Sequence, residues 1–219
     1  AIGSAALTAL ALIASYVEKV ETLAPDMALD MSVMNPVVLV GIFVGPCLAF
    51  IFAAITMGSV GKAAHSVVLE VRRQFKEMPG IIEGKVDADF ARCVDLCTKA
   101  SLKEMVVPTL IAVGVPIVGG LLLGPAGVIG LLCGATASGF LLAVFMSNSG
   151  GSWDNAKKYV ESGHYGGKGS KNDKSAIVGD TIGDPFKDTS GPAINILIKL
   201  LSMVSIVFAT VVVHFHLFG

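Results

Sequence analysis

Long uninterrupted apolar runs constrain the fold of this chain more than any other feature. Residues 35–58, 104–124, 126–147 and 191–213 are each apolar over about twenty residues, which is the length that an α-helix needs to cross the hydrocarbon core of a bilayer. Charged residues make up only 15% of the sequence, whereas soluble domains contain roughly 25%. The sequence therefore predicts an all-α, polytopic membrane protein.

A fifth apolar run, AIGSAALTALALIASYV at 1–17, is shorter than the others. It has no initiator Met and no basic segment typical of a signal peptide, and at about 1.5 Å per residue it only just reaches across a bilayer. We expect the chain to begin inside a helix of a larger protein, so that any site it contains is incomplete.

The helices are expected to extend beyond the apolar runs. VGKAAHSVVLEVRRQFKEM, at 60–78, has the 3.6-residue recurrence of an amphipathic helix and is followed by Pro79 and Gly80, which end it. The Gly-, Lys- and Ser-rich segment 161–174 is expected to be a flexible loop. The expected helices span about 1–17, 35–76, 90–124, 126–160 and 181–213.

Basic residues are concentrated in two segments between the apolar runs. Eight of the 16 Lys and Arg residues lie between Lys62 and Lys103, and six lie between Lys157 and Lys187. Because cytoplasmic loops carry an excess of Lys and Arg, both segments are predicted to face the cytoplasm. The formal net charge of −1 gives no indication of a nucleic-acid partner.

An acidic motif, GDTIGDPFKDTSGP at 179–192, lies at the start of the last apolar run. Asp180, Asp184 and Asp188 are four residues apart, so on a regular α-helix they would form one acidic stripe about 12 Å long. In a purely structural interpretation they are a solvated helix start, with acids near the positive end of the helix dipole and Pro185 in the first turn. In a functional interpretation they are ligands.

Two further observations favour ligands. WDNAKK at 153–158 follows the fourth apolar run and supplies Asp154, Lys157 and Lys158, while Lys187 lies among the aspartates of the other motif. Carboxylate oxygens coordinate Mg²⁺, and neighbouring lysines suit a phosphate group bridged by such ions. Gly183, Gly191 and Pro192 predict an irregular helix there, which is tolerated at the membrane edge where it lines a cavity. The pattern indicates a site for a Mg²⁺-complexed phosphate compound.

Lys199 lies within the last apolar run, eleven residues after Asp188. Eleven residues correspond to about three helical turns, or roughly 16 Å, and return to nearly the same helix face. A lysine that snorkels to the interface is one explanation, and a place on an ion pathway is the other. Asn195, one turn earlier, could take part in such a pathway.

At these residues the sequence resembles the membrane-integral pyrophosphatases, which use pyrophosphate hydrolysis to pump protons or sodium ions. The resemblance is carried by GGSWDNAKKYVE, GDTIGDPFKDTSGPAINILIK, AIGSAAL and EVRRQF, and it covers essentially the whole chain. Its most specific part is the DxxxDxxKD element followed by Gly-Pro and an intramembrane lysine. The 161–174 loop is shorter than in plant vacuolar members.

The resemblance implies a homodimer with about sixteen helices per subunit, of which this chain would supply the last five as the C-terminal transmembrane portion. It implies that Lys157 and Lys187 bind the phosphates and that Asp188 activates the attacking water. Lys199, with Asn195, would belong to an ion gate below the site. The implied ligands of several Mg²⁺ ions, or supporting acids of that cluster, are Asp154, Asp180, Asp184 and Asp188.

The same resemblance implies a multi-pass protein in membrane lipid, either in a vacuolar or acidocalcisomal type of endomembrane or in a prokaryotic plasma membrane, with the site facing the cytoplasm. The pumped ion, H⁺ or Na⁺, and a requirement for K⁺ are left open, because their determinants lie upstream in this family. We expect the fragment alone to be inactive, since about half of the metal ligands would be absent.

Two other function classes use similar chemistry. Membrane prenyltransferases hold Mg²⁺-diphosphate with aspartates at spacings of three and four, although they would need a second Asp-rich motif and a lipid groove. A Mg²⁺ transporter or channel could use an acidic ring without catalysis, but lysines beside the ring would repel the cation. Competition by a non-hydrolysable diphosphate analogue would separate both from a pyrophosphatase.

Overall fold

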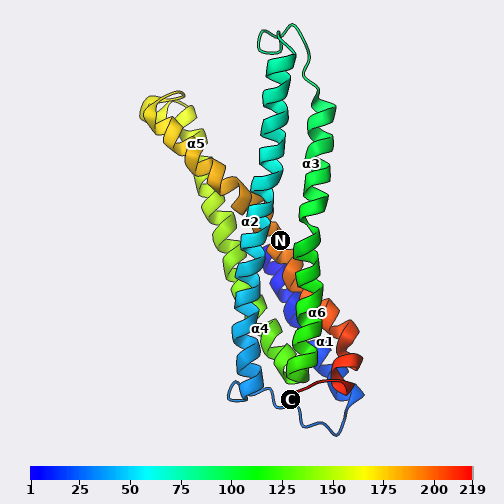
Figure 1. The fold of residues 1–219 in the computed structure, drawn as a ribbon. Helices are drawn as coiled ribbons and strands as arrows, with labels where there is room; N and C mark the ends of the chain where they lie inside the picture. Colours follow the sequence, from blue (N-terminus) through cyan, green and yellow to red (C-terminus); the bar gives the residue numbers. More distant parts are fainter. Residues whose placement is uncertain (219) are drawn as a thin grey trace.

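The computed structural model describes residues 1–218, and over this range it consists of helices joined by turns and loops (Figure 1). The elements are α1 (Ile2–Leu23), α2 (Pro36–Glu77), α3 (Phe90–Glu104), α4 (Val106–Glu161), the 3₁₀ turn η1 (His164–Gly166), α5 (Lys171–Asp184), the π-helical turn η2 (Pro185–Ser190) and α6 (Gly191–His214).

Four stretches of helix in the described part of the chain are long and apolar enough to cross a membrane, and one of them contains a reversal. Within α4, Gly124 has φ 68° and ψ −176°, so that two helices meet there. Glycine adopts this positive φ without steric cost, and Pro125 suits the start of the second helix. The chain turns back on itself at this point (Figure 1), which agrees with the predicted separation of the runs 104–124 and 126–147.

The membrane segments pack closely through small residues. α2 lies against the second half of α4, where Gly130 is so close to α2 that a Cβ atom there would lie 2.2 Å from the carbonyl oxygen of Val38. Close approach at small residues is the usual way in which membrane helices gain packing energy. The largest side chains buried in this core include Tyr16, Leu131, Ile194 and Leu201.

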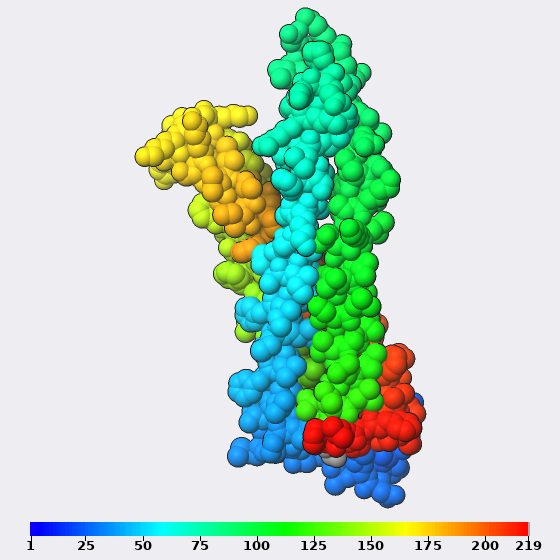
Figure 2. Space-filling model, viewed as in Figure 1, coloured from blue at the N-terminus to red at the C-terminus, as the bar shows by residue number. Residues whose placement is uncertain are grey.

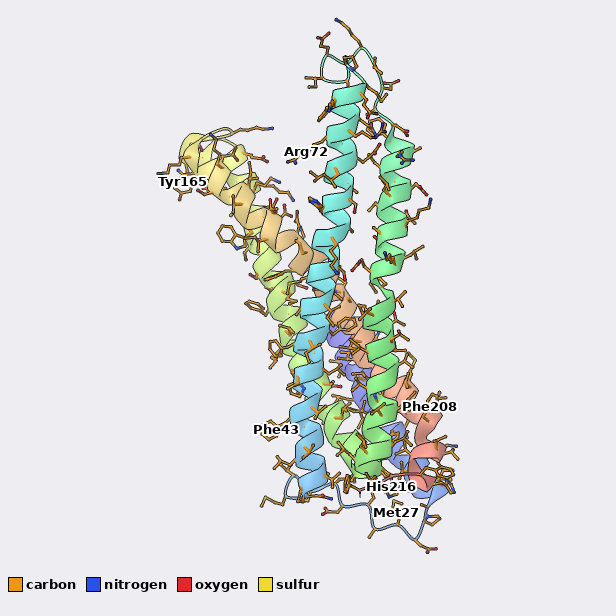
Figure 3. The ribbon with its side chains drawn as sticks, in the orientation of Figure 1. Met27, Phe43, Arg72, Tyr165, Phe208 and His216 are labelled. Carbon is orange, nitrogen blue, oxygen red and sulfur yellow. The ribbon has the colours of Figure 1, made fainter. Side chains whose placement is uncertain are left out.

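Two helical extensions leave the bundle at the same end. α2 and α3 form one hairpin, and the end of α4 with α5 forms an arm that tilts away from it (Figures 1 and 2). Tyr165 marks the tip of the arm, and Arg72 lies on the projecting part of α2 (Figure 3). Both basic segments therefore lie at one end of the molecule, as predicted from their charge.

The opposite end holds the connection between α1 and α2 and the end of α6, marked by Met27 and His216 (Figure 3). Backbone N–H groups of Leu217 and Phe218 donate to the carbonyls of Leu121 and Leu122, at 2.9 Å each. These bonds attach the segment after α6 to the reversal in α4.

The structure corrects several predicted boundaries. α1 continues to Leu23, well past residue 17, and a break at Met105 divides the predicted helix 90–124 into α3 and the start of α4. Residues 171–174, predicted to be part of a flexible loop, already belong to α5. The reason is the N-cap at Ser170, whose hydroxyl accepts a hydrogen bond from the backbone N–H of Asp173 at 3.1 Å.

Candidate functional site

The WDNAKK and GDTIGDPFKD motifs lie side by side because α5 and η2 pack unusually closely on the last part of α4. A Cβ atom on Gly150 would lie 2.4 Å from the carbonyl oxygen of Gly183 and 2.7 Å from Cβ of Lys187. Gly179 likewise lies against the ring of Trp153, which a Cβ atom would approach to 2.2 Å. The absence of side chains at these positions therefore sets the distance between the charged residues of the two motifs.

The deepest ion pair joins Lys157 of α4 to Asp180 of α5. Lys157 Nζ donates to Asp180 Oδ2 at 2.7 Å, and the aspartate side chain is only 7% exposed. The other oxygen, Asp180 Oδ1, is buried and makes no hydrogen bond. A buried carboxylate with one unsatisfied oxygen is costly in free energy unless a further ligand is bound.

Lys187 lies among three carboxylates. Its Nζ is 2.9 Å from Asp154 Oδ2, 3.6 Å from Asp184 Oδ1 and 3.7 Å from Asp188 Oδ2. Asp154 also accepts a hydrogen bond from Lys158 Nζ at 3.0 Å. The predicted site residues of the two motifs are thus gathered into one cluster, in which each ammonium group is paired with at least one carboxylate.

The three aspartates do not share one regular α-helix, as the predicted acidic stripe requires: Asp180 and Asp184 belong to α5, whereas Asp188 lies in the turn that follows. Between α5 and α6 the chain forms the π-helical turn η2, in which the backbone N–H of Gly191 donates to the carbonyl of Phe186. This wider turn changes the helical spacing after Asp184. The side chain of Asp180 faces α4, where it pairs with Lys157, and is buried, whereas those of Asp184 and Asp188 are 50% and 63% exposed. The predicted irregularity of this helix is confirmed.

Lys199 and Asn195, the predicted gate residues, lie on α6 below the cluster and are both partly buried. The amide oxygen of Asn195 is buried without a hydrogen-bond partner. Within residues 1–218, Lys199 forms no ion pair. The structure does not join these two residues to each other or to the cluster.

Two features next to the cluster were not predicted from the sequence: the close packing at Gly150, and a hydrogen bond between the hydroxyls of Thr56 and Ser190, whose oxygens are 3.0 Å apart. The glycine could have been noticed, because Gly150 in one motif and Gly183 in the other both lie within four residues of an aspartate of their motif. Thr56 could not, because it lies in an apolar run far from either motif and only the fold brings it next to Ser190.

The chemistry of the cluster fits Mg²⁺ as a bound cofactor. All candidate ligands are carboxylate oxygens, Asp180 Oδ1 is buried and free to coordinate, and the ammonium of Lys187 occupies a position that attracts a cation. No three His, Cys, Asp or Glu side chains of residues 1–218 are close enough to enclose a metal ion by themselves. Such an arrangement suits Mg²⁺, which is commonly held by one or two carboxylates together with phosphate oxygens and water.

Comparison with known proteins shows a consistent relationship. The profile of the family described as "Inorganic H+ pyrophosphatase" matches residues 1–208. A protein of Methanosarcina mazei, "K(+)-insensitive pyrophosphate-energized proton pump", is 53% identical over 97% of this chain and 31% of its own length. A protein of Bacteroides thetaiotaomicron, "Putative K(+)-stimulated pyrophosphate-energized sodium pump", is 50% identical over 100% of this chain and 33% of its own length. The chain thus spans about a third of these curated relatives.

Proposed function

The chain belongs to the inorganic H⁺ pyrophosphatase family, and from this premise we propose that the protein containing it hydrolyses inorganic pyrophosphate and uses the reaction to pump H⁺ or Na⁺ across a membrane. It is an integral, multi-pass membrane protein. The observation that supports the activity best is the cluster of alternating lysines and aspartates at the end of the bundle from which both basic segments project. In this proposal the chain forms the C-terminal transmembrane part of a homodimer.

Charge explains why the reaction would need a metal. The cluster contains four carboxylates, of Asp154, Asp180, Asp184 and Asp188, and three ammonium groups, of Lys157, Lys158 and Lys187. Pyrophosphate is itself a polyanion, so a site with a net charge of −1 would repel it. We propose that Asp154, Asp180, Asp184 and Asp188 hold Mg²⁺. When bound, Mg²⁺ would neutralise the phosphates and polarise the bond that breaks.

Lys157 and Lys187 would bind the phosphate oxygens of the substrate. Each now pairs with a carboxylate at hydrogen-bond distance, 2.7 and 2.9 Å respectively. These pairs hold the long side chains in place before the substrate arrives, which lowers the entropy lost on binding. As the carboxylates turn toward the cofactor, the ammonium groups would become available to the phosphates.

Asp188 is suited to hold the attacking water and accept its proton. It has the most exposed carboxylate of the cluster, at 63%, and its oxygen is 3.7 Å from Lys187 Nζ. Water can therefore reach it beside a residue that binds phosphate. A positioned carboxylate of this kind acts as a general base.

The proton accepted at Asp188 would be released at the top of the helix that carries Lys199. In this proposal Lys199, together with Asn195, forms part of the gate for the pumped ion. Replacing Lys199 by alanine in the full-length protein is expected to leave hydrolysis measurable while lowering the number of ions pumped per phosphate released. The measurement is ion uptake and phosphate release in the same vesicles; an unchanged ratio would remove Lys199 from the gate.

The function is tested by phosphate release from Mg²⁺-pyrophosphate in sealed vesicles that carry the full-length protein, with and without a protonophore. Faster release when the protonophore collapses the gradient would establish coupling to protons. Release that responds only to a sodium ionophore would establish coupling to Na⁺.

Repeating both assays with and without K⁺ decides whether K⁺ is a further cofactor, because one relative is named as K⁺-stimulated and another as K⁺-insensitive. An absence of release would reject the proposal.

A further inference from the structure

A buried hydrogen bond connects the candidate site to a helix that contributes no charged residue to it. Thr56 of α2 and Ser190, the last residue of η2, are 1% and 0% exposed, and their hydroxyl oxygens are 3.0 Å apart. The two residues are separated by 134 positions in the sequence. Among residues 1–218 this is the side-chain hydrogen bond that joins α2 to η2.

The direction of this hydrogen bond follows from the other partner of Thr56. Its hydroxyl also lies 2.9 Å from the carbonyl oxygen of Ala53, which can only accept. The single proton of Thr56 is used there, so Ser190 donates to Thr56 Oγ1. Both hydroxyls are thereby satisfied in a buried environment, where an unpaired hydroxyl would be costly.

The hydrogen bond holds the end of η2 on the side that faces α2, whereas the close packing at Gly150 and the Lys187–Asp154 ion pair hold η2 on the side that faces α4. η2 is a π-helical turn, an irregular geometry that is often found at functional sites. It carries Lys187 and Asp188, and its next residue, Thr189, lines a cavity of about 310 Å³ between α2 and α3. Because Thr189 faces this cavity, packing alone does not fix the position of this side of the turn. The directional hydrogen bond from the neighbouring Ser190 to Thr56 can fix it.

We propose that Thr56 is a positioning residue for pyrophosphate hydrolysis, which acts through Ser190 to hold η2 in the geometry that places Lys187 and Asp188. This inference rests on the proposed function and adds to it a residue outside both motifs. Thr56 touches neither substrate nor metal. Its role depends on the hydroxyl and not on the methyl group, since only the hydroxyl reaches Ser190.

The experiment is a double-mutant cycle in the full-length protein, with kcat for Mg²⁺-pyrophosphate hydrolysis measured per folded molecule. Thr56→Val removes the hydroxyl at nearly constant volume, and Ser190→Ala removes its partner. Each single variant is expected to lower kcat about tenfold, because loss of the bond shifts η2 away from its catalytic geometry by a free energy comparable to that of one buried hydrogen bond. The double variant should be no slower than either single variant, because both remove the same bond. Thr56→Ser, which keeps the hydroxyl, should restore kcat to within about twofold.

Ser205→Ala is the matched control. Ser205 is also buried on α6, but its hydroxyl bonds only to the carbonyl of Leu201 in its own helix, at 2.9 Å; kcat should be unchanged. Normal kcat in both single variants, losses that multiply in the double variant, or failure of Thr56→Ser to restore activity would each overturn the inference. If Thr56→Val does not fold, Ser190→Ala and Thr56→Ser decide the question by the same criteria. An inactive wild-type protein would instead contradict the proposed function.

Discussion

Asp188→Asn in the full-length protein is expected to reduce pyrophosphate hydrolysis by about a thousandfold, the contribution of a positioned general base. Asparagine keeps the size of the side chain but cannot accept a proton from water. Because the Asp188 side chain is 63% exposed and its nearest charged contact, Lys187, is 3.7 Å away, the substitution should leave folding intact. The measurement is phosphate release at saturating Mg²⁺-pyrophosphate, together with the thermal unfolding midpoint.

A matched control is available on α3. Asp95 is similarly exposed and pairs with Lys99 at 2.8 Å, but it lies on the α2–α3 hairpin and outside the cluster. Asp95→Asn should retain normal hydrolysis. Near-normal hydrolysis by Asp188→Asn would contradict its assignment as the base. A large fall in both variants would indicate a general effect of charge and would not support a specific role.

Gly150→Ala is expected to abolish hydrolysis although it replaces no charged residue. The added methyl group would lie 2.4 Å from the carbonyl oxygen of Gly183, so α5 and η2 must move away from α4. Such overpacking costs roughly 3 kcal/mol of folding free energy. A displacement of about 1 Å at a catalytic group already lowers activity by about a hundredfold. Hydrolysis and the thermal unfolding midpoint should therefore both fall.

The neighbouring residue provides the comparison. Gly151 is in the same helix, and a Cβ atom there would meet no other atom within 4 Å. Gly151→Ala should leave hydrolysis unchanged and should stabilise the helix by up to about 1 kcal/mol, because alanine has the higher helix propensity. Equal activity of the two alanine variants would show that the close approach of α4 and α5 is not required for the site.

The membrane segments and the proximity of the two charged motifs could be predicted from the sequence for physical reasons. The length of each apolar run matches the thickness of the bilayer. The reversal at Gly124 could therefore be located at the boundary between the runs 104–124 and 126–147. WDNAKK follows one membrane segment and the second motif precedes the next one, so both motifs are expected at the same side of the membrane. The proximity of Asp154 and Lys157 to the second motif could therefore be predicted.

What could not be predicted depends on contacts between distant segments. The burial of Asp180 depends on the packing of α5 against α4, and the position of Asp188 depends on the π-helical geometry of η2; neither has a simple signal in the sequence. The N-cap at Ser170 was hidden in a segment whose glycines and lysines indicate a flexible loop. The contact of Thr56 with Ser190 requires the tertiary structure itself.

The π-helical turn has one further consequence, for the rotational phase of the last membrane helix. Each residue of an α-helix advances the direction of its side chain by about 100°. The wider turn at 185–190 therefore determines the directions in which the side chains of α6 point, relative to those of α5. Deleting a single residue from η2 would rotate Lys199 and Asn195 by about that angle while leaving both motifs nearly complete. The turn thus sets the angular register between the charged cluster at the end of the bundle and the intramembrane part of α6.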